Sequence, residues 1–293
     1  MIIQHNTITM KNIKQQEESN EFLYSFFEKS KLSTIQLFHN DKPEWEKTRP
    51  EPIGSGVLFE FNNNYYIVTA AHVVYDYAMK KPRNPYREED DYDDPSDAYL
   101  TLNNIGIVYN QYYYPVQHVK FVYTNEKRLE RNIDIAIITI DLDSVKELKE
   151  SFTFITLNDI LTNHNTSIDG IYYTYGYPAS WTEIEDKSCL IKHEPFMFIT
   201  KGVVPNNIKI TFDKEDNILI SYSKKDIYYT SIEKDIDDFS PNGISGCGLW
   251  YYDKNTEPKL VGIMIEDKSI KENAFLMMAT KIDIAIGLIT RSC

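Results

Sequence analysis

Short apolar runs, rich in β-branched and aromatic residues, follow one another along most of the chain. Clusters of Asn, Asp, Gly and Pro separate them, and this combination predicts short strands joined by turns. Three consecutive asparagines, residues 62–64, lie between two such runs and predict a hairpin turn. The expected strands are residues 33–39, 54–61, 65–71, 99–109, 116–124, 133–141, 170–178, 196–204, 207–212, 217–223, 248–253 and 259–267.

Two segments are expected to be helical. Residues 16–30 carry apolar side chains at spacings of one and four, which predicts a short amphipathic helix near the N-terminus. The last apolar segment, residues 279–289, is compatible with a strand or a helix, and we expect a C-terminal helix. The apolar residues of the first segment are Phe22, Leu23, Phe26 and Phe27.

Many short strands without alternating helices argue against a parallel α/β sheet. They predict an all-β chain built from antiparallel barrels or a sandwich. The chain has 293 residues, of which 42% are hydrophobic and 26% charged, enough for a packed core in one large domain or two small ones. No internal repeat at a fixed period is apparent.

The charge balance excludes some partners. The net charge is −13, and no dense Lys/Arg stripe offsets it, so a nucleic-acid partner is not expected. No window approaches 18 consecutive apolar residues, so neither a transmembrane helix nor a membrane partner is expected. Residues 1–20 lack the charged head, apolar centre and cleavage site of a secretory signal.

Cysteine and histidine usage points to a reducing compartment and to chemistry without a metal. The three cysteines are odd in number and lack framework spacing, whereas a secreted all-β domain of this size usually carries several disulfides. A cytoplasmic location is therefore expected. The six histidines are scattered and form no CxxC, HxxxH or HExxH pair, so no metal and no cofactor is expected.

An acidic segment stands apart from the strands. Residues 86–98 hold seven carboxylates with little apolar content, which is typical of a solvated surface loop. A docking or inhibitory loop, or a cation site, is the alternative. The segment lacks the Asp/Asn/Gly spacing of a calcium-binding loop, which disfavours calcium.

Three polar residues in strand-like surroundings form a candidate catalytic set. His72 ends the run "YYIVTAAH", Asp134 enters the apolar run "NIDIAIITI", and Ser245 lies in "NGISGCGLWYY". A serine hydroxyl is a weak nucleophile near neutral pH unless a base takes its proton, and histidine suits that task. The histidine in turn needs a carboxylate that fixes its tautomer, and a partly buried Asp134 needs such a partner.

The glycines around Ser245 fit the same chemistry. A tetrahedral intermediate carries negative charge on oxygen, which backbone N–H groups stabilise when they converge on one point. Such convergence demands unusual backbone angles that glycine permits. We expect the N–H groups of Gly243 and Ser245 to form this oxyanion hole, with Gly246 and Gly248 letting the next strand pass close to a substrate.

These stretches resemble the trypsin-like (chymotrypsin-fold) serine peptidases. The order His, Asp, Ser matches that family, as do "TAAH", "DIAI", "GISGCG" and the upstream "GSGV". The resemblance spans residues 33–290 and implies two six-stranded antiparallel barrels, with the active site between them, and a C-terminal helix. It implies a first barrel at about residues 33–150 and a second at about 165–280, behind an N-terminal extension of residues 1–32.

The resemblance also suggests where a substrate would bind. It puts the base of the primary pocket near Phe239 and the cleft-lining strand at Ile265, Glu266 and Asp267. The acidic residues either favour basic substrate side chains or face water. Two departures from the family are Ile244, where an Asp or Asn is usual, and Cys247, where a glycine is usual. Ile244 cannot form the ion pair that activates secreted zymogens, and Cys247 is expected to be a packing residue.

Two functions remain open at this point. The first is an intracellular endopeptidase of bacterial type that acts on protein or peptide substrates through His72, Asp134 and Ser245. Such an enzyme needs restraint, so a regulatory protein partner is expected, with residues 16–30 and 86–98 as candidate docking or inhibitory segments. The second is a catalytically silent module that retains the peptidase fold for binding or sensing.

Overall fold

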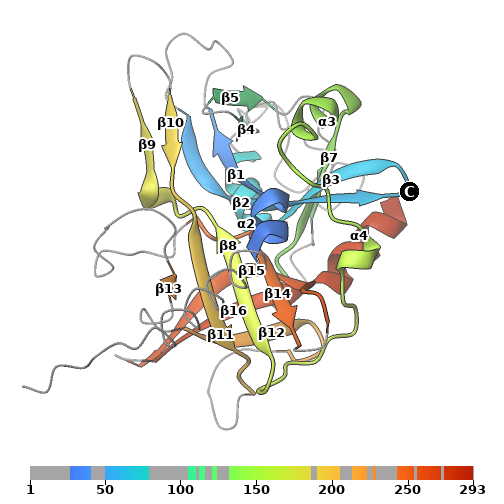
Figure 1. Ribbon diagram of the computed structural model, residues 1–293, viewed down its shortest axis with the longest axis vertical. Helices are drawn as coiled ribbons and strands as arrows, with labels where there is room; N and C mark the ends of the chain where they lie inside the picture. Colours follow the sequence, from blue (N-terminus) through green and yellow to red (C-terminus); the bar gives the residue numbers. More distant parts are fainter. Residues whose placement is uncertain are drawn as a thin grey trace, which may run out of the picture.

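The computed structural model consists mainly of two curled antiparallel sheets with few helices, so the predicted all-β class is confirmed (Figure 1). The acidic segment 86–98 and the predicted strand at 207–212 lie outside the described residues, as do residues 1–26. The described residues are 27–40, 50–78, 105–109, 112–115, 121–123, 132–185, 190–204, 213–222, 227–228, 243–253, 256–271 and 274–292.

The first sheet has seven described strands in the order β5-β4-β1-β2-β3-β7-β6. The predicted barrel had six. The pattern missed β5, because its tyrosines follow β4 after a two-residue connection, Tyr109 pairing with Tyr112. The strands are β1 (Thr34–His39), β2 (Glu51–Phe61), β3 (Asn64–Thr69), β4 (Ile105–Tyr109), β5 (Tyr112–Pro115), β6 (Phe121–Tyr123) and β7 (Ala136–Ile140).

The predicted asparagine turn is confirmed as the hairpin that joins β2 to β3. Phe61 pairs with Asn64, so two residues form the loop. Asn62 and Asn63 have φ values of 50° and 60°. Two successive left-handed residues match the right-handed twist of the flanking strands, and asparagine tolerates this conformation better than most residues.

The second sheet also has seven described strands, in the order β12-β16-β15-β14-β8-β11-β13. After β11, Gly202 forms a bridge to Ile220 of β12, and the N–H of Val203 donates to the carbonyl of Leu219 at 2.9 Å. Six strands therefore form a ring, and β13 pairs outside it on β11. The strands are β8 (Ile171–Gly176), β11 (Phe196–Lys201), β12 (Asn217–Tyr222), β13 (Ile227–Tyr228), β14 (Gly248–Tyr252), β15 (Lys259–Lys271) and β16 (Ala274–Lys281).

The helices differ from the predicted set. The expected C-terminal helix is present, but it begins at Ile282, because residues 279–281 complete β16 against β15 and β12. Two helices were not predicted, α2 (Ala71–Ala78) and α3 (Leu142–Leu148), the latter capped by Asp141. Among the described helices, none combines the length and apolar character that a membrane crossing requires. The last helix is α4 (Ile282–Ser292), and two 3₁₀ turns are η4 (Leu157–Asp159) and η5 (Ala179–Trp181).

The two sheets share their core. One cluster combines Leu37 and Ile67 of the first sheet with Leu219 and Met278 of the second. A second cluster joins the first sheet, the second sheet and α4. Burial of this kind stabilises both sheets together, at roughly 25 cal/mol for each Å² of apolar surface removed from water. The expected boundary between two barrels, at residues 150–165, stays a prediction.

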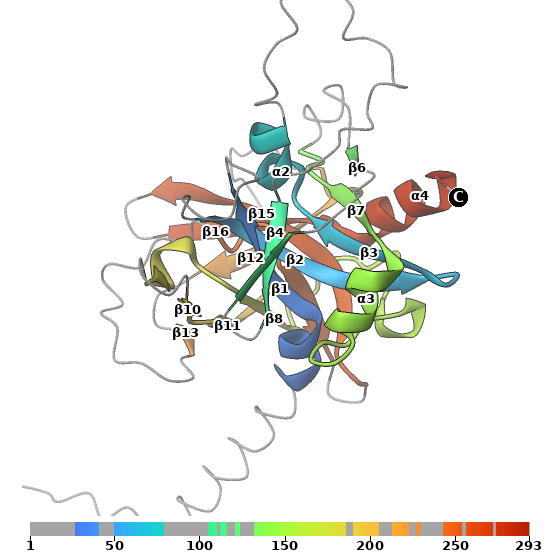
Figure 2. The same cartoon turned by 90° about the horizontal axis from the view of Figure 1, so that it is seen from above.

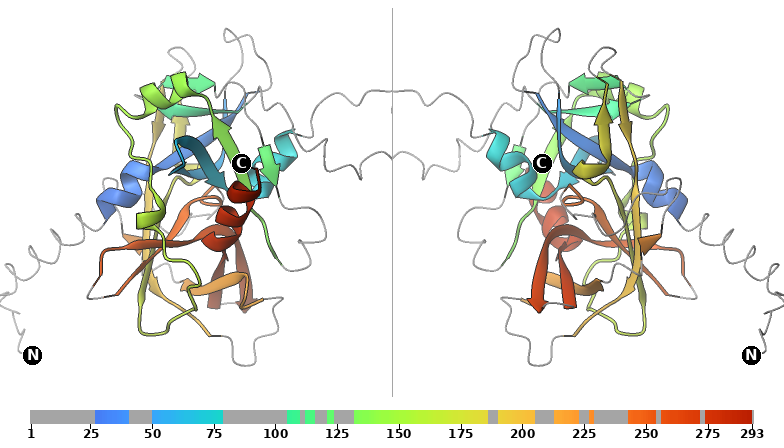
Figure 3. Two further views of the ribbon diagram at one scale, coloured as in Figure 1. Left: turned by 90° about the vertical axis from the view of Figure 1, so that its right-hand side faces the viewer. Right: turned by 90° about the vertical axis from the view of Figure 1, so that its left-hand side faces the viewer.

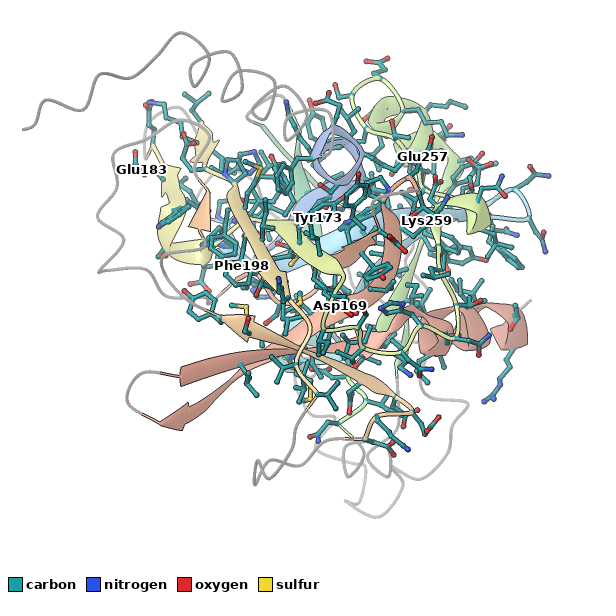
Figure 4. The ribbon with its side chains drawn as sticks, turned by 60° about the horizontal axis from the view of Figure 1, so that its bottom comes forward. Asp169, Tyr173, Glu183, Phe198, Glu257 and Lys259 are labelled. Atoms are coloured by element: carbon teal, nitrogen blue, oxygen red, sulfur yellow. The ribbon has the colours of Figure 1, made fainter. Side chains whose placement is uncertain are left out.

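Tyr173 and Phe198, both labelled in Figure 4, show how the second sheet separates two parts of the core. They lie on adjacent strands, β8 and β11, and both are fully buried. Tyr173 belongs to the cluster that contains Phe27 and Trp250, whereas Phe198 belongs to the cluster inside the second ring. The period-2 alternation of strand side chains therefore sends neighbouring aromatics to opposite faces.

A small hairpin connects the second sheet to β1. Its strands are β9 (Thr182–Ile184) and β10 (Ile191–His193). The side-chain amide of Gln36 donates to Thr182 Oγ1 at 2.7 Å, and its carbonyl oxygen lies 2.8 Å from His193 Nδ1. Gln36 is 1% exposed, so both of its polar ends are satisfied inside the protein.

The described end of the N-terminal helix, residues 27–33, packs on the side of the molecule away from α2 (Figures 2 and 3). Phe27 meets the ring of Tyr173 edge-on at 4.9 Å between centroids. Lys29 Nζ lies 2.6 Å from Asp159 Oδ1, and the carbonyl of Leu32 accepts the N–H of Thr153. A helix in residues 16–30 was predicted, and its described portion ends at residue 33.

Candidate active site

His72 lies in the first turn of α2 and not at the end of a strand, as the sequence had suggested. β3 ends at Thr69, and the N–H of Val73 donates to the carbonyl of Ala70 at 3.2 Å. The side chains of Val73 and Val74 are buried, so they form the face of α2 that packs against the core. His72 is left on the outer side with its side chain 46% exposed.

Asp134 lies in the segment that leads into β7, between the buried side chains of Ile133 and Ile135. Its side chain is 16% exposed. The second sheet holds this segment in place, because the carbonyl of Asn132 accepts the side-chain amide of Asn217 at 2.8 Å. Asn132 has a φ of 51°, so the chain turns sharply just before the aspartate.

His72 and Asp134 are in direct contact. His72 Nδ1 forms a hydrogen bond with Asp134 Oδ2, and the backbone N–H of the histidine donates to Oδ1 at 2.9 Å. Both carboxylate oxygens therefore bind the same residue, which sets the orientation of the imidazole. A carboxylate at Nδ1 favours the tautomer that carries its proton there and leaves Nε2 as the acceptor.

Ser245 lies on a tight loop that docks against two elements. The N–H of Gly246 donates to the carbonyl of Met264 on β15 at 2.8 Å. The carbonyl of Ser245 accepts the N–H of Ser55 on β2, also at 2.8 Å. Gly243 and Gly246 have φ values of 96° and 89°, angles that favour glycine.

One glycine shows that the loop and α2 meet. A Cβ on Gly54 would lie 2.7 Å from Val73 Cγ1 and 3.0 Å from the carbonyl oxygen of Ser245. Val73 is the neighbour of His72, so the start of α2 and the serine loop pack against the same point of β2. The structure thus brings all three predicted residues to one region. It also gives a steric reason for the first glycine of "GSGV".

The hydroxyl of Ser245 does not bind His72 in this structure. It donates to the carbonyl of Ile265 at 3.4 Å and has no other acceptor among the described residues. Ile265 is a bulge position, because Met264 pairs with Ala279 whereas Glu266 pairs with Met278. Bulges of this kind redirect backbone groups next to functional sites. A change of the serine χ1 rotamer is the motion needed to turn its hydroxyl toward another acceptor.

The two N–H groups predicted to form an oxyanion hole are available. Within the described residues, neither the N–H of Gly243 nor that of Ser245 donates a hydrogen bond. The next two N–H groups of the loop are engaged, since Gly246 donates to Met264 and Cys247 donates to Ile244. Unpaired N–H groups on a glycine-rich loop can stabilise an anion.

The predicted substrate-binding residues fare differently. Phe239 lies outside the described residues, and so do the side chains of Glu266 and Asp267, whose backbones are part of β15. The side chain of Ile265 is 3% exposed and belongs to the core that both sheets share. Only its carbonyl reaches Ser245, so a side-chain contact between Ile265 and a substrate is not possible in this arrangement.

Cys247 is fully buried and contacts Thr174, whose hydroxyl oxygen lies 2.8 Å from Cys247 Sγ. Burial raises the pKa of the Cys247 thiol to about 12, and the contact with Thr174 opposes that rise only in part. Because the thiolate is the reactive form, this residue acts as packing next to the serine loop. Among the described residues, no group of three or more His, Cys, Asp and Glu side chains could hold a metal ion.

Two other described histidines, His164 and His193, are uncharged near neutral pH. Burial lowers the pKa of His164 to about 4, and the nearby charge of Lys281 adds to this effect while that of Asp283 opposes it. Burial also lowers the pKa of His193 to about 4, with the charge of Glu194 opposing the shift. His118, for which the sequence suggested no functional role, lies outside the described residues.

Acidification is expected to destabilise the fold through these two histidines. Between about pH 6.5 and pH 4 the unfolded chain binds their protons and the folded chain does not, so the free energy of unfolding falls as the pH falls. Each imidazole contributes about 2–3 kcal/mol to this loss by pH 4.5. Urea unfolding between pH 7 and pH 4.5 measures the slope, and His164→Gln should remove about half of it. An unchanged slope in that variant would contradict the assignment.

Comparison with known proteins adds little to this geometry. No protein-family profile and no curated protein matches the chain. One similar solved structure is described as "Aromatic interactions drive the coupled folding and binding of the intrinsically disordered Sesbania mosaic virus VPg protein". The match covers 87% of this chain and 89% of that one, with 11% sequence identity and a TM-score of 0.42. At this sequence identity and TM-score, the similarity does not indicate a function for this chain.

Proposed function

We propose that this protein is a serine endopeptidase that acts through His72, Asp134 and Ser245. The observation that carries the proposal is the coupling of His72 to Asp134 through both carboxylate oxygens. The serine loop packs against the same glycine of β2 as the start of the histidine helix, which supports a shared site. The trypsin-like resemblance of the surrounding motifs agrees with this assignment.

Each residue has one role in the proposed reaction. The hydroxyl of Ser245 leaves the carbonyl of Ile265 and turns to His72 Nε2, which removes its proton as the oxygen attacks a peptide carbonyl. Asp134 holds the imidazole and stabilises the imidazolium. The N–H groups of Gly243 and Ser245 bind the developing oxyanion, and His72 then protonates the leaving amine. After the amine product leaves, water attacks the acyl-enzyme while His72 takes its proton, and His72 then returns that proton to the Ser245 oxygen as the bond to the acid product breaks.

A silent peptidase-fold module is the second candidate, because one observation favours it. The serine hydroxyl rests on Ile265 and not on His72. A scaffold that had lost catalysis would have no need to move it. Against it, Asp134 already orients His72, and catalytic hydrogen bonds often form only when substrate binds, so the peptidase remains the better supported function.

Covalent labelling by a fluorophosphonate separates the two candidates. The reagent needs an activated serine, so the folded protein should become labelled at Ser245, as identified by mass spectrometry of the modified peptide. Ser245→Ala and the heat-unfolded wild type are the controls, and neither should react. The labelling rate should fall as the pH drops through about 6–7, where the base becomes protonated. A folded wild type that stays unlabelled would favour the silent module, and a rate independent of pH from 5 to 8 would exclude His72 as the base.

We further propose that the enzyme is intracellular and that a protein partner controls its activity. The described part of the N-terminal helix lies on the opposite side from α2, so these residues do not cover the site (Figure 3). Its contacts with Tyr173 and Asp159 instead reach the second sheet and the connection between the sheets. A partner that bound residues 27–32 would therefore act on the site indirectly.

A further inference from the structure

Ser55 connects the serine loop to both sheets. It lies in the middle of β2, between Gly54 and Gly56, and it is fully buried. Every polar group of the residue has a partner. A buried hydroxyl that both donates and accepts is strongly restrained, since losing either bond leaves a buried polar group unpaired.

Two of these bonds hold the loop on either side of Ile244. The hydroxyl of Ser55 donates to the carbonyl of Gly243 at 3.1 Å, and its backbone N–H donates to the carbonyl of Ser245 at 2.8 Å. The two carbonyls lie two residues apart in the chain. Ser55, a residue of the first sheet, thus binds the backbone carbonyls on both sides of Ile244, in the loop that carries the proposed nucleophile.

The remaining bonds fix Ser55 itself. The N–H of Tyr177, just beyond the end of β8, donates to the Ser55 hydroxyl at 3.1 Å. The backbone carbonyl of Ser55 accepts the hydroxyl of Thr69 at 2.7 Å. The same carbonyl is the atom nearest to a Cβ placed on Gly246, at 2.0 Å. Strands β2, β3 and β8 therefore determine where the loop can lie.

We propose that Ser55 is a positioning residue for the oxyanion hole. Its hydroxyl binds the carbonyl of Gly243 and its N–H binds the carbonyl of Ser245, so it restrains the backbone conformation of the segment whose N–H groups, those of Gly243 and Ser245, would form the hole, with Gly243 at a φ of 96°. Ser55 does not touch the reacting atoms and acts through the loop. The inference rests on the proposed peptidase function for its kinetic consequence, but not for its structural one.

The kinetic test compares two serine-to-alanine variants. Ser55→Ala should lower kcat for peptide hydrolysis about 10- to 100-fold while KM stays within about twofold, because a misplaced donor weakens transition-state binding. Ser33→Ala is the matched control, since Ser33 is also fully buried and donates to a backbone carbonyl, that of Lys29, at 2.8 Å. It should change kcat by less than about twofold. If Ser55→Ala does not fold, Ser55→Cys keeps a slightly larger side chain of the same shape with only a weak donor and should show the same kinetic loss.

The structural test does not depend on activity. Amide hydrogen exchange at Gly246 and Cys247 should accelerate at least about tenfold in Ser55→Ala and remain unchanged in Ser33→Ala. If the wild type fails to label with a fluorophosphonate, the proposed function fails, and the exchange rates alone decide the role of Ser55. Unchanged exchange in Ser55→Ala, or unchanged kcat in an active enzyme, would overturn the positioning role.

Discussion

Replacing Ser245 with alanine is expected to lower kcat for peptide hydrolysis by about 10⁴- to 10⁶-fold without unfolding the protein. The alanine removes the nucleophile, so the acyl-enzyme cannot form. The fold should tolerate the change, because the hydroxyl makes one bond of 3.4 Å, to the carbonyl of Ile265. Steady-state kinetics on a peptide substrate, together with a urea denaturation curve, measure both effects.

His72→Ala should cost about as much as Ser245→Ala, and the double variant should lose little more. A nucleophile and its base act as one unit, so their effects do not add. Asp134→Asn should lower kcat about 10⁴-fold, because an amide that donates to Nδ1 forces the imidazole into the wrong tautomer. Asp141→Asn is the matched control, since Asp141 caps α3 and asparagine is an equally good cap.

Additive losses among the three residues would contradict a coupled triad. A folded wild type with no more activity than Ser245→Ala and the uncatalysed background would leave the silent module as the remaining function, whereas measurable hydrolysis by both proteins at one rate would exclude Ser245 as the nucleophile. A loss in Asp141→Asn as large as that in Asp134→Asn would mean that the assay reports stability and not chemistry. Each outcome therefore bears on a different step of the proposal.

The strand pattern and the site motifs were readable from the sequence because local chemistry determines them. Short β-rich runs with polar turns predicted most strands, and the paired asparagines at 62–63 adopt the left-handed angles of a tight hairpin. The residues Ser245, His72 and Asp134 could be chosen because each needs the others chemically. The fold, and not the local sequence, brings the start of α2 and the serine loop together, because both pack against Gly54 of β2.

Several features depended on tertiary contacts that no local pattern encodes. His72 lies in the first turn of a helix because Val73 and Val74 pack inward, whereas the sequence pattern predicts that the preceding strand continues to this residue. Ile265 is predicted to lie on the strand that meets a substrate backbone, and this contact stays a prediction; that its side chain lies in the core while a bulge presents its carbonyl to Ser245 could not be seen in the sequence. Ser55 was seen only as part of a supporting motif, since its role depends on partners in three distant segments.

Gly246→Ala is expected to lower the free energy of unfolding by about 3–5 kcal/mol. Gly246 has a φ of 89°, which L-residues rarely adopt. A Cβ there would lie 2.0 Å from the carbonyl oxygen of Ser55 and 2.2 Å from Thr69 Oγ1. The first of these atoms is backbone in the middle of β2, so it cannot move aside without disturbing the sheet. Urea denaturation monitored by tryptophan fluorescence measures the loss.

Gly287→Ala is the control for this substitution. Gly287 lies in α4, and a Cβ there would meet no atom within 4 Å. Alanine in a helix should raise the free energy of unfolding by about 0.5–1 kcal/mol. The two variants make the same chemical change with opposite expected signs, so the difference isolates the backbone constraint at the serine loop. If Gly246→Ala were as stable as wild type, the loop would have to lie elsewhere than between β2 and β15, and the common site of His72, Asp134 and Ser245 would lose its structural basis.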